Sequence, residues 1–140
     1  MAGNDRNSRV EFNDTDYQRL IGLKLNEVDG KDPQKVRSLN ALIDKLERFV
    51  KGQANGITPS QLRNIYSVIK ELEDDKLGEL IFLRPKLAYI SARQQNRKAL
   101  VMTDFISKLI SKVSTQAEFK NFKTVMEAVV AYHKLYYKGN

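Results

Sequence analysis

Cationic side chains and one tyrosine recur at helical spacing in the middle of the sequence. Lys86, Tyr89, Arg93 and Arg97 follow one another at intervals of three or four residues. On a regular helix, such side chains project from one side about 5–6 Å apart, which is close to the spacing of phosphates along an RNA strand. Arginine binds phosphate oxygens in pairs, lysine adds a point charge, and tyrosine can stack on a base or a sugar. The pattern indicates contact with a nucleic-acid backbone.

Other cations extend this candidate surface. Arg63 and Lys70 lie seven residues apart, so both project from one side of a helix, next to an apolar stripe. Four cations are candidates for their charge only: Arg97, already named, and Arg48, Lys51 and Lys112. The candidate RNA-binding residues are therefore Arg63, Lys86, Arg93, Arg97, Lys70, Arg48, Lys51 and Tyr89.

An ordinary structural role also fits these residues. Charged side chains form the usual solvent face of a helix, so Lys86 and Arg93 fit either role equally. For Tyr89 we favour a place in the core with its hydroxyl at the rim, since buried tyrosines of this kind are common. The C-terminal tyrosines, Tyr132, Tyr136 and Tyr137, fit three roles that the sequence leaves open: binding a partner protein, binding nucleic acid, or capping the fold.

The net charge of +7 is concentrated in the second part of the chain. Residues 1–83 contain 13 Lys or Arg and 14 Asp or Glu, whereas residues 84–140 contain 11 and 3. No acidic residue occurs from Leu80 to Thr103. One-sided positive charge points to a polyanionic partner, usually nucleic acid, although it also serves the solubility of a helical surface.

Catalytic and metal-binding chemistry has little support in the sequence. The absence of cysteine excludes a disulfide, a thiolate metal site and a cysteine nucleophile, and it fits a reducing cytoplasm. The single histidine, His133, follows apolar residues, which predicts a packed or half-exposed ring rather than a catalytic one. Gly52 and Gly56 flank no phosphate-loop lysine. We expect a non-enzyme that needs no cofactor and no metal, with no apolar run long enough to cross a membrane.

Helical segments with clear start signals must position these residues. The first begins with Asp32 as N-cap and Pro33 in its first turn, and Gly52 is its expected stop. The second and fifth begin at capping boxes in residues 58–61 and 115–118. The second segment ends before the acidic residues 74–75, and the fifth runs to about residue 137.

Two further helices lie between these. The third spans about residues 77–94 and contains Pro85, so either it kinks there or it ends near Leu83 and restarts with Pro85 in a first turn. The fourth spans about residues 96–113. No alternating strand pattern occurs, and short connections make neighbouring helices roughly antiparallel. We predict an all-α fold, with a compact bundle of about five helices (residues 32–140) after a flexible, loosely structured N-terminal arm (residues 1–31).

Three stretches of the sequence resemble one known family. Residues 57–66 read ITPSQLRNIY, residues 83–93 read LRPKLAYISAR, and residues 126–134 read MEAVVAYHK. In their order and spacing they resemble the small (Csm) subunit of type III-A CRISPR effector complexes, over about residues 35–138. The first 31 residues match no part of that pattern.

The resemblance implies a helical, non-catalytic RNA-binding subunit of a cytoplasmic ribonucleoprotein for antiviral defence. It implies contact with the backbone of the CRISPR guide RNA and target RNA, because base pairing reads the sequence. It also implies three kinds of protein partner: a large polymerase-like subunit, the backbone subunits, and neighbouring copies of the small subunit. Arg63, Lys86 and Arg93 match basic positions of the family.

Two other functions remain open from the residues. A helical DNA-binding transcriptional regulator would need a recognition helix after a tight turn, and residues 94–97, QQNR, are the best candidate for that turn. A protein-only adaptor would bind its partner through the C-terminal tyrosines, with the positive charge incidental. Salt-sensitive RNA binding without sequence preference would distinguish the CRISPR subunit from the regulator and from the adaptor.

Overall fold

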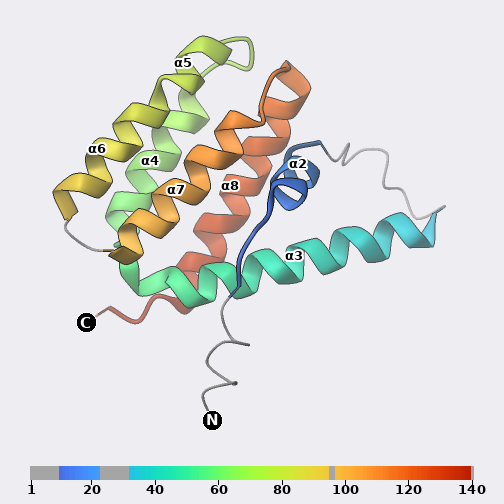
Figure 1. Cartoon of the computed structure of the whole chain (residues 1–140), viewed down its shortest axis with the longest axis horizontal. Helices are drawn as coiled ribbons and strands as arrows, with labels where there is room; N and C mark the ends of the chain where they lie inside the picture. Colours follow the sequence, from blue (N-terminus) through green and yellow to red (C-terminus); the bar gives the residue numbers. More distant parts are fainter. Residues whose placement is uncertain (1–9, 23–31, 95–96, 140) are drawn as a thin grey trace.

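Regular structure is helical throughout the residues that the structure describes. The computed structural model describes residues 10–22, 32–94 and 97–139. Their elements, in chain order, are α2 (Asp14–Gly22), α3 (Pro33–Gln53), the short 3₁₀ helix η2 (Ala54–Gly56), α4 (Pro59–Glu71), α5 (Leu77–Ile81), α6 (Leu83–Gln94), α7 (Arg97–Ser111) and α8 (Gln116–Tyr136). The predicted all-α fold is confirmed (Figure 1).

Three helices begin where the sequence marks a start. The Asp32 carboxylate accepts hydrogen bonds from two backbone N–H groups in the first turn of α3. Thr58 and Gln61 form the expected capping box of α4, since each side chain accepts from the other residue's backbone N–H. The Thr115 hydroxyl accepts from the N–H of Glu118 at the start of α8. Such caps satisfy donors that every helix start leaves open, so local sequence is enough to locate them.

Pro85 lies in the first turn of a new helix. The third expected segment is divided into α5 and α6, which meet at Phe82. A proline in the first turn of α6 costs little, because the first N–H groups of a helix have no partner within it. Of the two alternatives, the restart near Leu83 is the observed one. Another small difference is that α3 continues one residue past Gly52, its expected stop.

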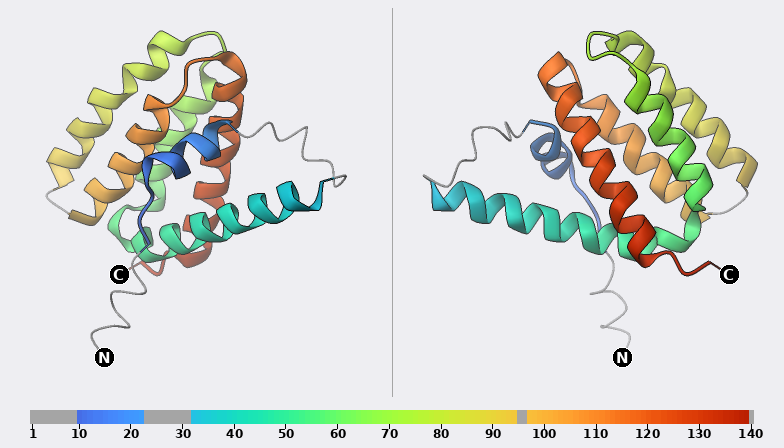
Figure 2. Two further views of the ribbon diagram at one scale, coloured as in Figure 1. Left: turned by 45° about the vertical axis from the view of Figure 1, so that its right-hand side comes forward. Right: turned by 180° about the vertical axis from the view of Figure 1, so that it is seen from behind.

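Four helices lie alongside one another, and a fifth crosses their ends. α4, α6, α7 and α8 form the group, in which α4 packs on α8 and α6 packs on α7 (Figure 1). α3 lies across one end of the group and extends past it, as both views of Figure 2 show. α6 is therefore an edge helix, with packing concentrated on its α7 side.

Helix α2 and the residues before it complete the core. The α2 side chains of Tyr17, Leu20 and Ile21 are buried, and Phe12 lies edge-on to Phe105 of α7, with ring centroids 5.1 Å apart. Where the N-terminal arm is described, its apolar side chains thus dock on the bundle. Residues 1–9 and 23–31 lie outside the described residues, so the division of the chain at residue 31 stays a prediction.

Polar contacts hold α2 in place. Asn13 and Asp16 cap the helix reciprocally, and Lys45 of α3 forms an ion pair with Asp16 at 2.5 Å. Asn121 of α8 donates to the backbone oxygen of Ile21 at 2.7 Å. Burial raises the pKa of the Asp16 carboxyl, but the hydrogen bonds from Lys45 and Asn13 and the nearby positive charges together bring that pKa below its usual value.

Candidate nucleic-acid interface

The candidate cations lie at the surface wherever their side chains are described. Six of them are exposed: Arg48, Lys51, Arg63, Lys70, Lys86 and Arg93. Within the described part of the chain, no carboxylate forms an ion pair with any of the six, whereas Lys45, Lys108, Lys112, Lys120 and Lys123 are paired. The positive charge of the six is thus not neutralised locally, and it remains available to an anionic ligand. Arg97 begins α7, but its side chain lies outside the described ones.

One row of candidate residues runs along α6. Lys86, Tyr89 and Arg93 share a side of this helix, because it is regular from Leu83 to Gln94. The Tyr89 side chain is 63% exposed, so the core position that we favoured for it is wrong. The Arg93 guanidinium carbon lies 5.7 Å from the centre of the Tyr89 ring. Arg97 does not continue the row, since it belongs to another helix.

The reason for the exposure of Tyr89 is the way α6 packs. α6 turns Leu83, Leu87 and Ser91 inward. The buried Ser91 hydroxyl pairs with that of Thr103 on α7, which fixes the rotation of the helix. Tyr89 projects from a different side from these inward residues and finds no helix to cover it.

The candidate residues of α4 lie on a separate side of the molecule. Arg63 and Lys70 project together, and the Lys70 ammonium lies 5.9 Å from the centre of the Tyr66 ring. The Tyr66 hydroxyl in turn donates to Glu127 of α8 at 3.5 Å. Burial, followed by the neighbouring Glu127 carboxylate, raises the pKa of Tyr66. α4 and α6 thus present two basic edges rather than a single row.

The C-terminal tyrosines mainly fasten α8 to the rest of the fold. The Tyr136 hydroxyl donates to Glu47 of α3, and the Tyr137 ring stacks on His133 with centroids 5.3 Å apart. The hydrogen bond to Glu47 is the main cause that raises the pKa of Tyr136. The Lys51 ammonium lies 5.3 Å from the centre of the Tyr136 ring. Of the three roles left open for these tyrosines, these contacts fit the capping role.

An apolar groove between α4 and α6 was not anticipated from the sequence. Its volume is about 320 Å³, and it is lined by Gln61, Asn64, Ile65, Val68, Ile69, Leu83, Lys86, Leu87 and Ile90. Of the candidate cations, Lys86 alone takes part in this lining. The one signal in the sequence is that α6 carries apolar residues on more than one side, which is typical of a helix covered on more than one side.

His133 has a structural role. The side chain is 1% exposed, and its Nε2 lies 2.8 Å from the backbone oxygens of both Ala54 and Ile57. The ring therefore holds the η2 turn against α8, which agrees with the packed histidine expected from the sequence. The described residues contain no group of three or more His, Cys, Asp or Glu placed to hold a metal ion. None of the described helices is both long enough and apolar enough to span a bilayer.

Comparisons with known proteins identify one family. The family model described as Csm2 Type III-A matches residues 33–139. A curated protein from Enterococcus italicus, "CRISPR system Cms protein Csm2", is 31% identical over 101 residues, which cover 61% of this chain and 72% of that protein. No solved structure matches the chain.

Proposed function

The chain belongs to the Csm2 family of type III-A CRISPR systems, and from this premise we propose that it is a non-catalytic subunit of the effector ribonucleoprotein that binds the backbones of guide and target RNA. The observation that carries the proposal is the set of exposed cations on α4 and α6 that no carboxylate neutralises in the described part of the chain. The family resemblance agrees with this set, since Arg63, Lys86 and Arg93 also match basic positions of the family.

Backbone contact suits this surface better than base reading. Lys86 and Arg93 are two turns apart on α6, about 10 Å along the helix axis, which brings them within reach of phosphates on one strand. Cations at such positions bind phosphate without regard to base identity. An effector whose guide RNA selects the target by pairing needs only this sequence-independent contact from its small subunit.

Neighbouring copies of the chain are also proposed partners, because exposed carboxylates of one copy can pair with the exposed cations of another. The α4–α5 end carries the exposed carboxylates Glu71, Glu73, Asp75 and Glu79, while α6 runs from that end to Arg93. Contact between these carboxylates and Arg93 of a second copy would join copies head to tail. Such an assembly, together with the large and backbone subunits, would act in the cytoplasm, where the RNA is.

The test compares two charge reversals of equal size in the assembled complex. In the first variant, Arg63→Glu is combined with Arg93→Glu; in the control, Lys35→Glu is combined with Lys108→Glu. Each lost charge-assisted contact should cost about tenfold in affinity for a complementary target RNA, so the first variant should bind far more weakly than the control. The slope of log affinity against log salt should also flatten by about 0.7 for each lost phosphate contact. Equal affinities for the two variants would show that Arg63 and Arg93 do not contact the RNA.

A further inference from the structure

Three apolar side chains form an exposed patch where α5 meets α6. Phe82 is 73% exposed, more than any other large apolar side chain among the described residues, and its neighbour Ile81 is 46% exposed. Together with Arg84, Pro85 and Ser107 they line a shallow, open depression of about 430 Å³. The core gains little from a ring as exposed as that of Phe82, so the packing of the fold does not explain this patch.

Arg84 supplies a fixed positive charge beside the patch. Its Nε donates to the Ser107 hydroxyl of α7 at 3.0 Å, which holds the guanidinium against the bundle. Among the described residues no carboxylate lines the depression, and Glu79, the nearest in sequence, is not part of the lining. The terminal N–H groups of Arg84, which this bond does not use, can bind phosphate oxygens as a pair. An apolar face next to such a cation matches the two parts of a nucleotide, a flat base and a charged phosphate.

The patch continues the row of residues along α6. Phe82 has helical backbone angles, with φ of −69° and ψ of −8°, and it lies four residues before Lys86 and seven before Tyr89. It therefore shares their side of the helix, and exposed rings alternate with exposed cations from Phe82 to Arg93. The two rings are about 10 Å apart along the helix axis, so each can take a base of its own. Rings that alternate with cations are typical of surfaces that bind single-stranded nucleic acid.

Stacking on these rings requires bases that are not enclosed in a duplex. Within a double helix each base is covered on both faces by its neighbours, so a side chain reaches the flat face only of an unpaired base. A protein could also cover an apolar patch, but the alternation of rings and cations and the lack of any acidic residue from Leu80 to Thr103 favour RNA. Stacking accepts any base, so it agrees with binding that does not depend on sequence.

We infer that the depression at the α5–α6 junction binds an unpaired nucleotide of the RNA, with its base on Phe82 and its phosphate on Arg84. The inference rests on the proposed function, because it requires RNA to lie along α6. It adds a stacked base to a surface for which that function needs only backbone contacts.

Photo-crosslinking in the assembled complex identifies what covers Phe82. Benzoylphenylalanine in place of Phe82 keeps an aromatic side chain, and irradiation should join it to guide or target RNA at one nucleotide, which primer extension maps. In the same background, Arg84→Glu should reduce the yield of this RNA crosslink by about tenfold, because it removes the phosphate contact. Lys35→Glu, at an exposed position of α3 outside the depression, is the control and should leave the yield unchanged. A crosslink to any protein, no crosslink, or equal yields for these two variants would overturn the inference.

Fluorescence at the mapped nucleotide tests the stacking itself. Synthetic RNA carries aminopurine at that position, whose emission is quenched when it stacks on a ring. Phe82→Leu removes the flat ring but keeps an apolar side chain, so emission from the complex should rise, whereas Phe82→Trp should keep it quenched. Leu135→Ala is the control, since Leu135 is 67% exposed and lies outside the depression, and it should leave the emission unchanged. Equal emission from the Phe82→Leu complex and the unmodified one would overturn the inference; thermal melts of the variants exclude misfolding.

The two proposals fail separately in these experiments. If the charge reversal of Arg63 and Arg93 weakens target binding while position 82 crosslinks to protein, the proposed function stands and the nucleotide site is refuted. If the reversal has no effect while position 82 crosslinks to RNA, the nucleotide site stands, and Arg63 and Arg93 are not part of the RNA surface.

Discussion

The guanidinium of Arg93 lies over the ring of Tyr89 on the surface of α6, with Cζ 5.7 Å from the ring centroid. The two residues are one helical turn apart, so the helix itself brings them together. A tyrosine ring beneath the guanidinium restricts its motion and leaves its N–H groups directed toward ligands at the edge. The pair combines a charge for phosphate with a flat face for a base or sugar.

Removing the ring should weaken RNA binding without destabilising the fold. In the assembled complex, Tyr89→Ala should lower affinity for target RNA by about three- to tenfold, because both the stacking surface and the support of Arg93 are lost. Tyr89→Phe keeps the ring and should bind as the unmodified chain does. Fluorescence anisotropy with labelled RNA measures the effect, and an unchanged affinity for Tyr89→Ala would show that the ring takes no part.

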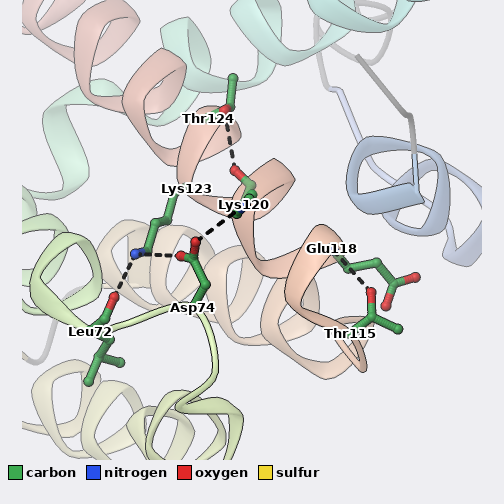
Figure 3. A network of polar contacts seen from close by, with 7 residues as sticks. All are labelled: Leu72, Asp74, Thr115, Glu118, Lys120, Lys123 and Thr124. Carbon is green, nitrogen blue, oxygen red and sulfur yellow. Dashed lines mark hydrogen bonds and ion pairs between the residues drawn. The ribbon is translucent and has the colours of Figure 1, made fainter. Parts of the chain in front are cut away.

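The connection between α4 and α5 is fastened to α8 mainly by Lys123. Lys123 donates to the backbone oxygen of Leu72 at 2.5 Å and to the Asp74 carboxylate at 3.0 Å (Figure 3). Lys123→Met should reduce the free energy of unfolding by about 1–3 kcal/mol, since it leaves both partly buried acceptors without this donor. Lys120→Met is the control, because Lys120 is largely exposed and lies 3.9 Å from Asp74, and its effect should be close to zero. Urea unfolding compares the two, and equal effects would contradict the assignment.

His133 should be replaceable only by another hydrogen-bond donor. His133→Leu removes the Nε2 bonds and leaves the buried oxygens of Ala54 and Ile57 unsatisfied, which should cost about 2–4 kcal/mol in unfolding free energy. His133→Gln retains an N–H donor and should cost less. In the unmodified protein, nitrogen NMR shifts should show a proton on Nε2. A proton on Nδ1 alone would be incompatible with two carbonyl acceptors at Nε2.

Tyr17 should make the fold sensitive to alkali. Burial, followed by the charges of Asp104 and Asp16, raises the pKa of Tyr17 to about 12 from its ordinary value of 10.0. Above pH 10 the unfolded chain loses this proton first, so the stability that Tyr17 contributes is complete below pH 10 and is lost as the pH rises toward 12. Tyr17→Phe should therefore show a smaller loss of stability between pH 9 and pH 11.5, measured by urea unfolding. An identical loss in both proteins would show that Tyr17 does not titrate abnormally.

The starts of the helices could be predicted from the sequence, whereas the way the helices pack on one another could not. Asp32, Thr58 and Thr115 were identified as helix starts because a cap involves only the next few residues. Tyr89 is exposed because α6 packs mainly on one neighbour, α7, and no second helix covers its other side. The residues of α6 alone do not show how many helices will pack against it. The groove is hidden for the same reason, since its two walls are some twenty residues apart in the chain.

Phe12 and α2 can pack on the bundle only late in translation. These residues leave the ribosome before the surfaces on α7 and α8 that receive them, and the Asn121–Ile21 hydrogen bond joins positions 100 residues apart. Among the described helices, the first to be made thus docks only after the chain is nearly complete, and contacts of such long separation slow folding. A shortened chain beginning near residue 32, where the family match starts, would leave the face of Phe105 that Phe12 and Tyr17 cover exposed, and would be prone to aggregate through it.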